Sequence, residues 1–298
     1  MPDVCGFKHQ VALFYTMLSF SLKTYKMEVK LRTLYVSDLD GTLLDKDGKL
    51  SDQDKAKLNE LIDSGTHFTV ASARSVESIR MILDGLKLTL PIISFNGAFL
   101  SDFASGKHIK IYPIMNDSIF DILKEEGALV SLHKEGQAYL YHMGNLSEGA
   151  KVFVKDRENS HGIEIDLLKD LPLNYDVMSY TVIGDKTHIL NLEKRLSVYD
   201  DIIVDAWEDM YYKPYYWLSV HSSEATKARG IDHLRDYVHV DRIVVFGDNT
   251  NDIEMFKYAD IGIAVENAVD ELKELADQVI GSHDQTSVIN KIIEMEKS

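Results

Sequence analysis

Short apolar runs alternate with amphipathic segments along the first hundred residues of the chain. Residues 34–37, 67–71 and 91–95 are largely apolar and contain β-branched side chains, which is typical of buried strands. Between them, residues 51–64 and 75–83 place apolar side chains at the three- and four-residue spacing of helices. Strands separated by helices of this length predict a parallel, doubly wound α/β sheet.

Both predicted helices carry signals at their ends. Ser51 and Ser75 are suitable N-cap residues, and Gly65 is suited to end the first helix. Four side chains are expected on the buried face of that first helix: Ala56, Leu58, Leu61 and Ile62.

The order of predicted elements changes after Pro113. Residues 114–214 indicate a helix, a hairpin, a second helix, a strand, a third helix and a further strand. This order is typical of an α+β unit with antiparallel strands, and about 100 residues is a usual domain size. We therefore expect an inserted α+β cap domain between two parts of a parallel-sheet core, residues 31–113 and 215–298. The aromatic residues at 211–217 are expected in a packed strand.

The first thirty residues do not continue the alternation. Residues 11–22 are mostly apolar, but a run of this length is too short to cross a bilayer. We expect residues 1–30 to be a leader outside the fold, with Met27 the more natural start of the first domain. An amphipathic membrane anchor is the alternative interpretation.

The composition is that of an ordinary soluble globular protein, with 45% hydrophobic and 27% charged residues among 298. The formal net charge of -16 argues against nucleic acid or an anionic membrane as a partner, because both need clustered lysine and arginine. A small anionic substrate would therefore need local cations at its site. The single cysteine, Cys5, excludes an intramolecular disulfide and suits a reducing cytoplasm.

Two carboxylates follow the first predicted strand. Asp38 and Asp40 have the two-residue spacing that sends strand side chains to one side, and Gly41 allows a sharp turn after them. Carboxylates held this close repel each other unless a cation lies between them or one keeps a proton. The first arrangement needs a hard divalent metal, and Mg²⁺ suits a site with few carboxylates and a substrate phosphate. For the pair taken alone, a solvated strand end is the alternative interpretation.

Polar groups also follow the other predicted strands. Ser72 comes after the second strand, Asn96 after the third, and Gly-Asp-Asn-Thr-Asn-Asp at residues 247–252 after a later one. Lys227 lies near the start of a helix. Because the carboxyl ends of parallel strands meet at one edge of a sheet, these groups are expected to gather there. Together they predict a site for phosphate and metal.

These motifs resemble those of the haloacid dehalogenase-like hydrolase superfamily. The matching residues are Asp38-Leu39-Asp40-Gly41-Thr42, Ser72, Lys227 and Gly247-Asp248-x-x-Asn251-Asp252. The long insertion resembles the C2-type cap of the Cof-type sugar phosphatases, and Phe95-Asn96-Gly97-Ala98 is also similar to that branch. The resemblance covers residues 33–298 and implies a Rossmann-like core with an inserted cap. The chain departs from the branch at Ala73 and Ala228, where glycine is usual.

The resemblance implies a Mg²⁺-dependent phosphomonoester hydrolase. Asp38 would be the nucleophile that forms an aspartyl-phosphate, and Asp40 would be the general acid and base. Mg²⁺ would be held by Asp38, the backbone carbonyl of Asp40, and Asp248.

The resemblance also implies that the remaining motif residues bind the phosphoryl group or orient other groups of the site. Asp252 would orient Lys227 or waters on the metal. The cap would close over the site and select the substrate. The phosphoryl oxygens would be held by Ser72, Lys227, Asn251 and backbone amides near Gly41 and Thr42.

The implied substrate is a small phosphorylated metabolite. Sugar phosphates lead, followed by flavin mononucleotide, pyridoxal phosphate and small polyol phosphates. A phosphotransferase or mutase would share all four motifs, and a non-catalytic sugar-phosphate sensor would share the fold. A dehalogenase is disfavoured because it does not need a second acid at Asp40, and a transport ATPase would carry Thr there.

Two histidines of the cap, His133 and His142, fall on the two strands of the predicted hairpin. A zinc site would need a third ligand, and none is evident in the sequence. We therefore expect these histidines to be stacked or solvated.

Overall fold

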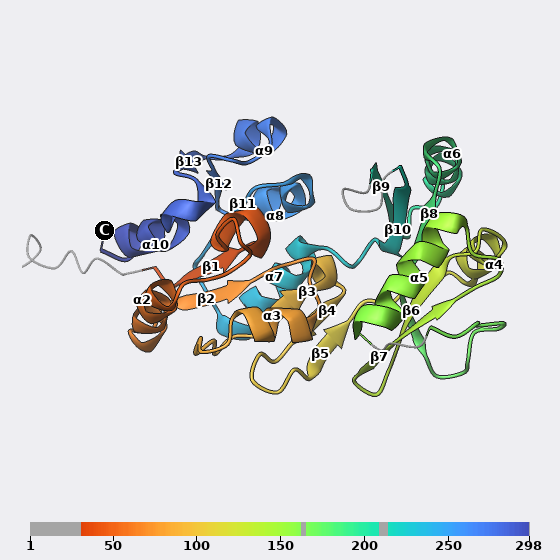
Figure 1. Cartoon of the computed structure of the whole chain (residues 1–298). Coiled ribbons are helices and arrows are strands. Elements are labelled where there is room, and N and C mark those ends of the chain that lie inside the picture. The colour runs from red at the N-terminus through yellow and green to blue at the C-terminus, as the bar shows by residue number, and fades with distance from the viewer. Residues whose placement is uncertain (1–30, 162–164, 209–213, 298) are drawn as a thin grey trace, which may run out of the picture. The chain divides into compact units, whose positions relative to one another are not determined.

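The computed structural model describes residues 31–161, 165–208 and 214–297 (Figure 1). The predicted leader, residues 1–30, lies outside the described residues. The chain from Thr33 onward forms one compact unit that contains both predicted sheets. No helix in the described part of the chain combines the length and apolar character needed to cross a membrane.

A five-stranded parallel sheet forms the core, in the order β13-β12-β11-β1-β2. The predicted doubly wound α/β sheet is therefore confirmed. Strand β1, which lies inside this sheet between β11 and β2, has only buried residues, because these strands flank it and helices cover it. The five strands are β1 (Thr33–Ser37), β2 (His67–Val70), β11 (Arg242–Gly247), β12 (Ile261–Val265) and β13 (Gln278–Ile280).

The helices of the core begin where the sequence predicts. The Ser51 hydroxyl accepts a hydrogen bond from the Asp54 amide, and Ser75 caps the next helix in the same way. Leu58 is buried, whereas Ala56 is exposed, contrary to prediction. Two positions correspond to about 200° around a helix, which places these two side chains on opposite faces. The core helices are α2 (Asp52–Asp63), α3 (Val76–Ile82), α7 (Lys227–Val238), α8 (Ile253–Tyr258), α9 (Asp270–Leu275) and α10 (Ser287–Lys297).

The third predicted strand, β3 (Ile92–Ser94), joins a different sheet from the first two. It pairs antiparallel with β4 (Phe99–Ser101), which pairs with β5 (His108–Ile111). A single isolated parallel bridge, between Ala71 and Ile93, links β3 to the end of β2. The antiparallel pairing of β3 with β4 therefore places β3 outside the core sheet.

The inserted segment forms a second, five-stranded sheet in the order β7-β6-β8-β10-β9, with every pair antiparallel. We call this segment the cap. The predicted insertion ends at residue 214, whereas β10 comes later and pairs with β8 and β9. Periodicity identified a strand there without revealing which sheet it joins. The cap strands are β6 (Leu129–Lys134), β7 (Gln137–His142), β8 (Asp176–Gly184), β9 (Ile202–Glu208) and β10 (Tyr216–Ser222).

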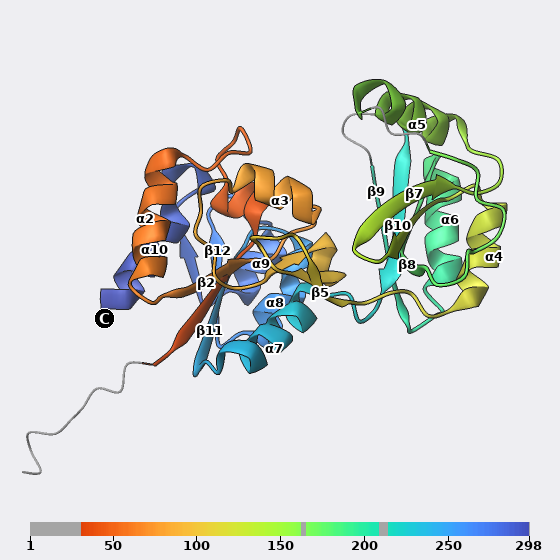
Figure 2. The ribbon, with the colours of Figure 1, turned by 90° about the horizontal axis from the view of Figure 1, so that it is seen from below.

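Helices pack on both faces of the cap sheet (Figure 2). α4 (Asp117–Glu125) and α6 (Lys186–Leu196) share one apolar cluster with buried side chains of β6, β8 and β10. α5 (Glu148–His161) contributes Phe153 and Val154 to a second cluster with Leu129 and Ile183. The cap is therefore an α+β unit, as predicted.

Candidate active site

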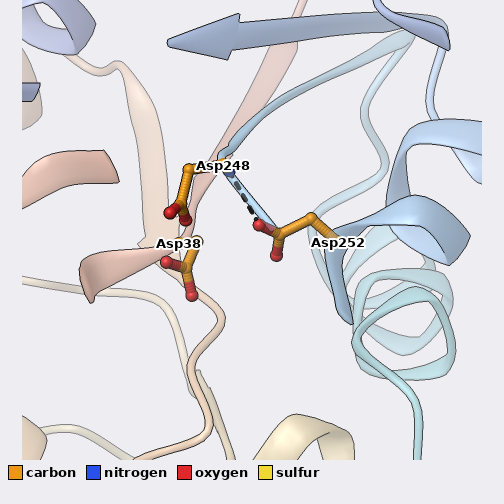
Figure 3. A group of neighbouring side chains, drawn as sticks. All are labelled: Asp38, Asp248 and Asp252. Carbon is orange, nitrogen blue, oxygen red and sulfur yellow. Dashed lines mark hydrogen bonds between the residues drawn. The ribbon is translucent and has the colours of Figure 1, made fainter. Parts of the chain in front are cut away.

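The site begins where two neighbouring strands of the core end. Ser37, the last residue of β1, is paired with Phe246 of β11, so the following Asp38 and Asp248 come to the same sheet edge. The Asp38 amide donates a hydrogen bond to the Phe246 carbonyl at 2.9 Å. Figure 3 shows these two carboxylates together with Asp252, which ends the short helix η3 (Thr250–Asp252). The predicted gathering at the carboxyl edge is therefore present for these three residues.

One ammonium group links two of the three carboxylates. The Lys227 Nζ lies 2.6 Å from an oxygen of Asp38 and 2.6 Å from an oxygen of Asp252, and all three side chains are buried. Burial opposes the charge on Lys227, yet attraction from Asp38 and Asp252 leaves its pKa above the ordinary value. The lysine therefore remains a cation at the centre of the site.

Burial disfavours the ionised form of two of the carboxylates. Burial raises the pKa of Asp38 to about 7, with the nearby charges of Asp252 and Asp248 adding to the effect and Lys227 opposing it. Burial followed by the charge of Asp252 raises the pKa of Asp248 to about 6. Three ionised carboxylates with one ammonium leave an excess of negative charge in a poorly solvated space.

This donor set fits a divalent cation. One oxygen from each of Asp38, Asp248 and Asp252 lies within 4.8 Å of the others. Asp248 accepts a hydrogen bond from the Thr42 hydroxyl through Oδ1 at 3.0 Å. Within the described part of the chain, no hydrogen bond reaches the second oxygen of Asp38 or of Asp248. Hard oxygen ligands with uncompensated charge are what Mg²⁺ requires.

Asp252 is occupied by other contacts. Its Oδ1 accepts from Lys227, and its Oδ2 accepts from the backbone amides of Asp248 at 2.9 Å and Asn249 at 3.1 Å. A carboxylate with three donors holds its neighbours in place more readily than it binds a metal. These contacts suit the positioning role that the sequence predicted for Asp252.

Asp40 lies apart from the three clustered carboxylates. Both of its oxygens accept hydrogen bonds from the guanidinium of Arg74, each at 2.6 Å, and its side chain is half exposed. The predicted alternation does not apply because β1 ends at Ser37 and the chain turns through η1 (Leu39–Leu43). The sequence analysis missed Arg74 as a site residue, although it follows Ser72 by only two positions.

The predicted phosphate-binding residues are connected through Asn96. Ser72 is buried, and its carbonyl accepts a hydrogen bond from the Asn96 amide. The Asn96 side-chain oxygen in turn accepts from Asn251 Nδ2 at 3.1 Å. Asn96 has a φ of 53°, in the left-handed region, and so does Phe95 at 47°. Asn96 therefore links the loop after β2 to the η3 helix after β11 through hydrogen bonds.

Gly41 is required by close packing. Its φ is +76°, and a Cβ added there would lie 2.4 Å from Asp248 Oδ2. Only glycine avoids this clash while keeping the left-handed conformation. The backbone at Gly41 therefore approaches Asp248 more closely than any residue with a side chain would allow.

His133 does not belong to a metal site in the described residues. Its ring lies 5.5 Å from Phe99 and 4.9 Å from His108, between ring centroids. His142 is at the opposite end of the β6–β7 pair. His133 is therefore buried among rings in tilted and edge-on contacts, and it is neither solvated nor stacked face to face.

Comparison with known proteins gives a consistent result. The model of the haloacid dehalogenase-like hydrolase family matches residues 35–292. The chain is 26% identical over 263 residues to the 5-amino-6-(5-phospho-D-ribitylamino)uracil phosphatase YitU of Bacillus subtilis, covering 86% of this chain and 94% of that protein.

Solved structures share the fold. A protein from Eubacterium rectale has a TM-score of 0.71 at 23% identity, covering 89% of this chain and 98% of that one. A phosphatase of the same superfamily from Bacteroides thetaiotaomicron has a TM-score of 0.68 at 20% identity, covering 91% and 97%.

Proposed function

Because the chain belongs to the haloacid dehalogenase-like hydrolase family, we propose that it is a Mg²⁺-dependent phosphomonoester hydrolase that acts through Asp38. The observation that carries this proposal is the buried Asp38 carboxylate. It is held by Lys227 through one oxygen and lies beside Asp248 at the sheet edge. Its second oxygen is available for attack on a phosphorus atom.

The reaction has two steps. In the first, an oxygen of Asp38 bonds to phosphorus and the ester P–O bond breaks, while Asp40 gives a proton to the departing oxygen. In the second, Asp40 takes a proton from water as the water oxygen bonds to phosphorus. The bond between Asp38 and phosphorus then breaks, which releases inorganic phosphate and restores both carboxyl groups.

Asp40 must move for the first step. Both of its oxygens accept hydrogen bonds from Arg74, so neither is placed to donate a proton. Rotation of Asp40 away from this pair would free the carboxyl group for the leaving oxygen. It would also leave the Arg74 guanidinium facing an anionic phosphoryl group, which it can bind through two hydrogen bonds.

The other residues bind and orient. Asp38, the backbone carbonyl of Asp40, and Asp248 would hold Mg²⁺, which supplies positive charge to offset that of the transferring group. Asp252 would fix Lys227. The phosphoryl oxygens would be held by Ser72, Lys227, Asn251 and backbone amides near Gly41 and Thr42.

The substrate is a small phosphorylated metabolite, with sugar phosphates and phosphorylated polyol chains preferred. This choice is supported by the name of the relative from Bacillus subtilis, which acts on a phosphorylated ribityl compound. The cap, taken as residues 114–222, would close over the leaving group and select it. The core would comprise residues 31–113 and 223–298. The protein would work in the cytoplasm.

The test is phosphate release from a panel of phosphomonoesters with and without Mg²⁺. Asp38→Asn should abolish Mg²⁺-dependent release because an amide cannot attack phosphorus. Asp185→Asn is the matched control: Asp185 caps α6 in the cap, and asparagine caps equally well. Release that persists in Asp38→Asn would contradict the proposal, and binding without any release would favour a sensor. Competition between water and alcohol acceptors separates hydrolysis from phosphotransfer.

A further inference from the structure

Asn267 contacts the turn after β1, residues 39–44, from a distant part of the chain. We call residues 39–44 the catalytic turn. It follows β12, and its Nδ2 donates a hydrogen bond to the Gly41 carbonyl at 2.8 Å, across 226 positions of sequence. The side chain is exposed, so burial does not explain its orientation.

The same residue is anchored at its other end. Asn267 Oδ1 accepts a hydrogen bond from the backbone amide of His283, at the start of η4 (His283–Gln285), at 3.1 Å. His283 Nδ1 is 2.7 Å from the Leu44 carbonyl, and since a carbonyl only accepts, the ring donates. Two carbonyls of the catalytic turn are thus held by one pair of side chains.

Holding the Gly41 carbonyl fixes the direction of the next amide. The Gly41 carbonyl and the Thr42 N–H belong to one planar trans peptide and point in opposite directions. Glycine readily adopts alternative backbone conformations, so this peptide plane could rotate without an outside contact. The Thr42 side chain is tied separately to Asp248. Asn267 therefore controls where the Thr42 amide points.

We propose that Asn267 is a positioning residue that aims the Thr42 amide at the phosphoryl group in the transition state. This inference rests on the proposed phosphatase function. A backbone donor held in place before the reaction stabilises developing charge without reorganisation. A peptide plane free to rotate would lose that advantage while leaving the substrate able to bind.

The chain contains a matched control in Asn59 of α2. Asn59 Nδ2 donates to the Gly85 carbonyl at 2.9 Å, and its Oδ1 accepts from the Lys87 amide at 2.8 Å. Gly85 also has a positive φ, +90°. Both asparagines therefore bridge a left-handed glycine carbonyl and a backbone amide, but Asn59 makes no contact with any site residue described above.

The experiment compares Asn267→Asp with Asn59→Asp at saturating Mg²⁺. Aspartate keeps the acceptor oxygen and replaces the donor with an oxygen that repels the carbonyl. We expect Asn267→Asp to lower kcat about tenfold to a hundredfold, with KM changed less than about threefold. Asn59→Asp should lower the unfolding temperature similarly and leave kcat unchanged. Asn267→Ala, which adds no charge, should also lower kcat.

A binding readout separates positioning from stability. When a nucleophile in an active site adds to it, orthovanadate takes the five-coordinate geometry of the transferring group, whereas bound inorganic phosphate stays tetrahedral. Asn267→Asp should weaken inhibition by orthovanadate more than inhibition by phosphate, and Asn59→Asp should change neither. If the parent protein releases phosphate but Asn267→Asp behaves like Asn59→Asp, the inference is overturned and the phosphatase function stands. If the parent releases no phosphate, both fall.

Discussion

The two sheets of this protein differ in whether charged side chains are buried beside them. At the carboxyl edge of the core sheet, Asp38, Lys227 and Asp252 are all buried and share one ammonium group. Between the cap sheet and its helices, the buried side chains of the main cluster are all apolar or aromatic. Among the described residues, every buried Asp, Glu, Lys or Arg side chain therefore lies at the carboxyl edge of the core sheet.

This difference separates stability from chemistry. A buried ion pair gains little net stability, because removing two charges from water costs several kcal/mol per ion. Apolar burial contributes about 25 cal/mol per Å² and demands no partner. The interior of the cap is stabilised by apolar burial. Under the proposed function, the charges at the carboxyl edge of the core sheet hold and activate Asp38. Mutations there should therefore change activity, whereas mutations in the cap interior should change stability alone.

Lys227→Met should have the largest effect on both stability and activity. It leaves Asp38 and Asp252 without their shared cation, and we expect a loss of about 3–5 kcal/mol in the free energy of unfolding. Phosphate release should fall about a thousandfold or more, since a preorganised cation is lost. Urea unfolding and steady-state kinetics measure the two effects.

Two further variants sharpen this test. Lys151→Met removes a surface ion pair with Glu148 and should change stability by less than about 1 kcal/mol. Adding Asp252→Asn to Lys227→Met should recover part of the stability but none of the activity, because one unpaired carboxylate is removed. Equal stability of the Lys227→Met and Lys151→Met proteins would break the comparison between buried and exposed charge.

Leu192→Ala in the cap should affect stability alone. Leu192 of α6 is buried in the main apolar cluster of the cap, so its truncation should cost about 2–5 kcal/mol in unfolding free energy. The control is Leu190→Ala on the same helix, where the side chain is 40% exposed and little loss is expected. Turnover at saturating substrate should change less than about threefold in both proteins. A large kcat loss in Leu192→Ala would show that the cap interior is coupled to the chemistry.

The smallest effect is expected from His133, the buried titratable group of the cap. Burial lowers the pKa of His133 below its ordinary value, and the attraction of Asp176 opposes this shift. The pKa of the neighbouring His108 is also lowered, first by burial and then by the charge of His133. The folded state therefore binds fewer protons than the unfolded state, and the stability contribution is complete above the unfolded pKa, about 6.5. It is lost as pH falls through the folded pKa. His133→Phe should reduce this acid-side loss, measured by urea unfolding at several pH values. Identical pH dependence in the two proteins would contradict the assignment.

Much of the fold could be predicted from local pattern. Ser51 and Ser75 cap the helices they were expected to cap, and Lys227 is the first residue of its helix. These features depend on a residue and its neighbours within about one turn. Ala56 was misplaced because the predicted face spanned more of the helix circumference than the core covers.

The contacts that shape the site were less accessible. The Asp40 carboxylate pairs with Arg74, and Gly41 is held by Asn267. Nothing near Asp40 or Gly41 in the chain specifies these partners. They meet because the parallel pairing of β2, β1, β11 and β12 brings the loops after these strands to one edge.

Local pattern was enough to predict most of the elements, the α/β class and the groups at the strand ends, because side-chain periodicity and turn residues act over short stretches of chain. Three features became clear only in the folded chain: β10 completes the cap sheet, Asp40 pairs with Arg74, and Asp38 and Asp252 share Lys227. Those outcomes depend on which backbone edges pair and which charges are buried together. Both are settled by competition among groups far apart in sequence.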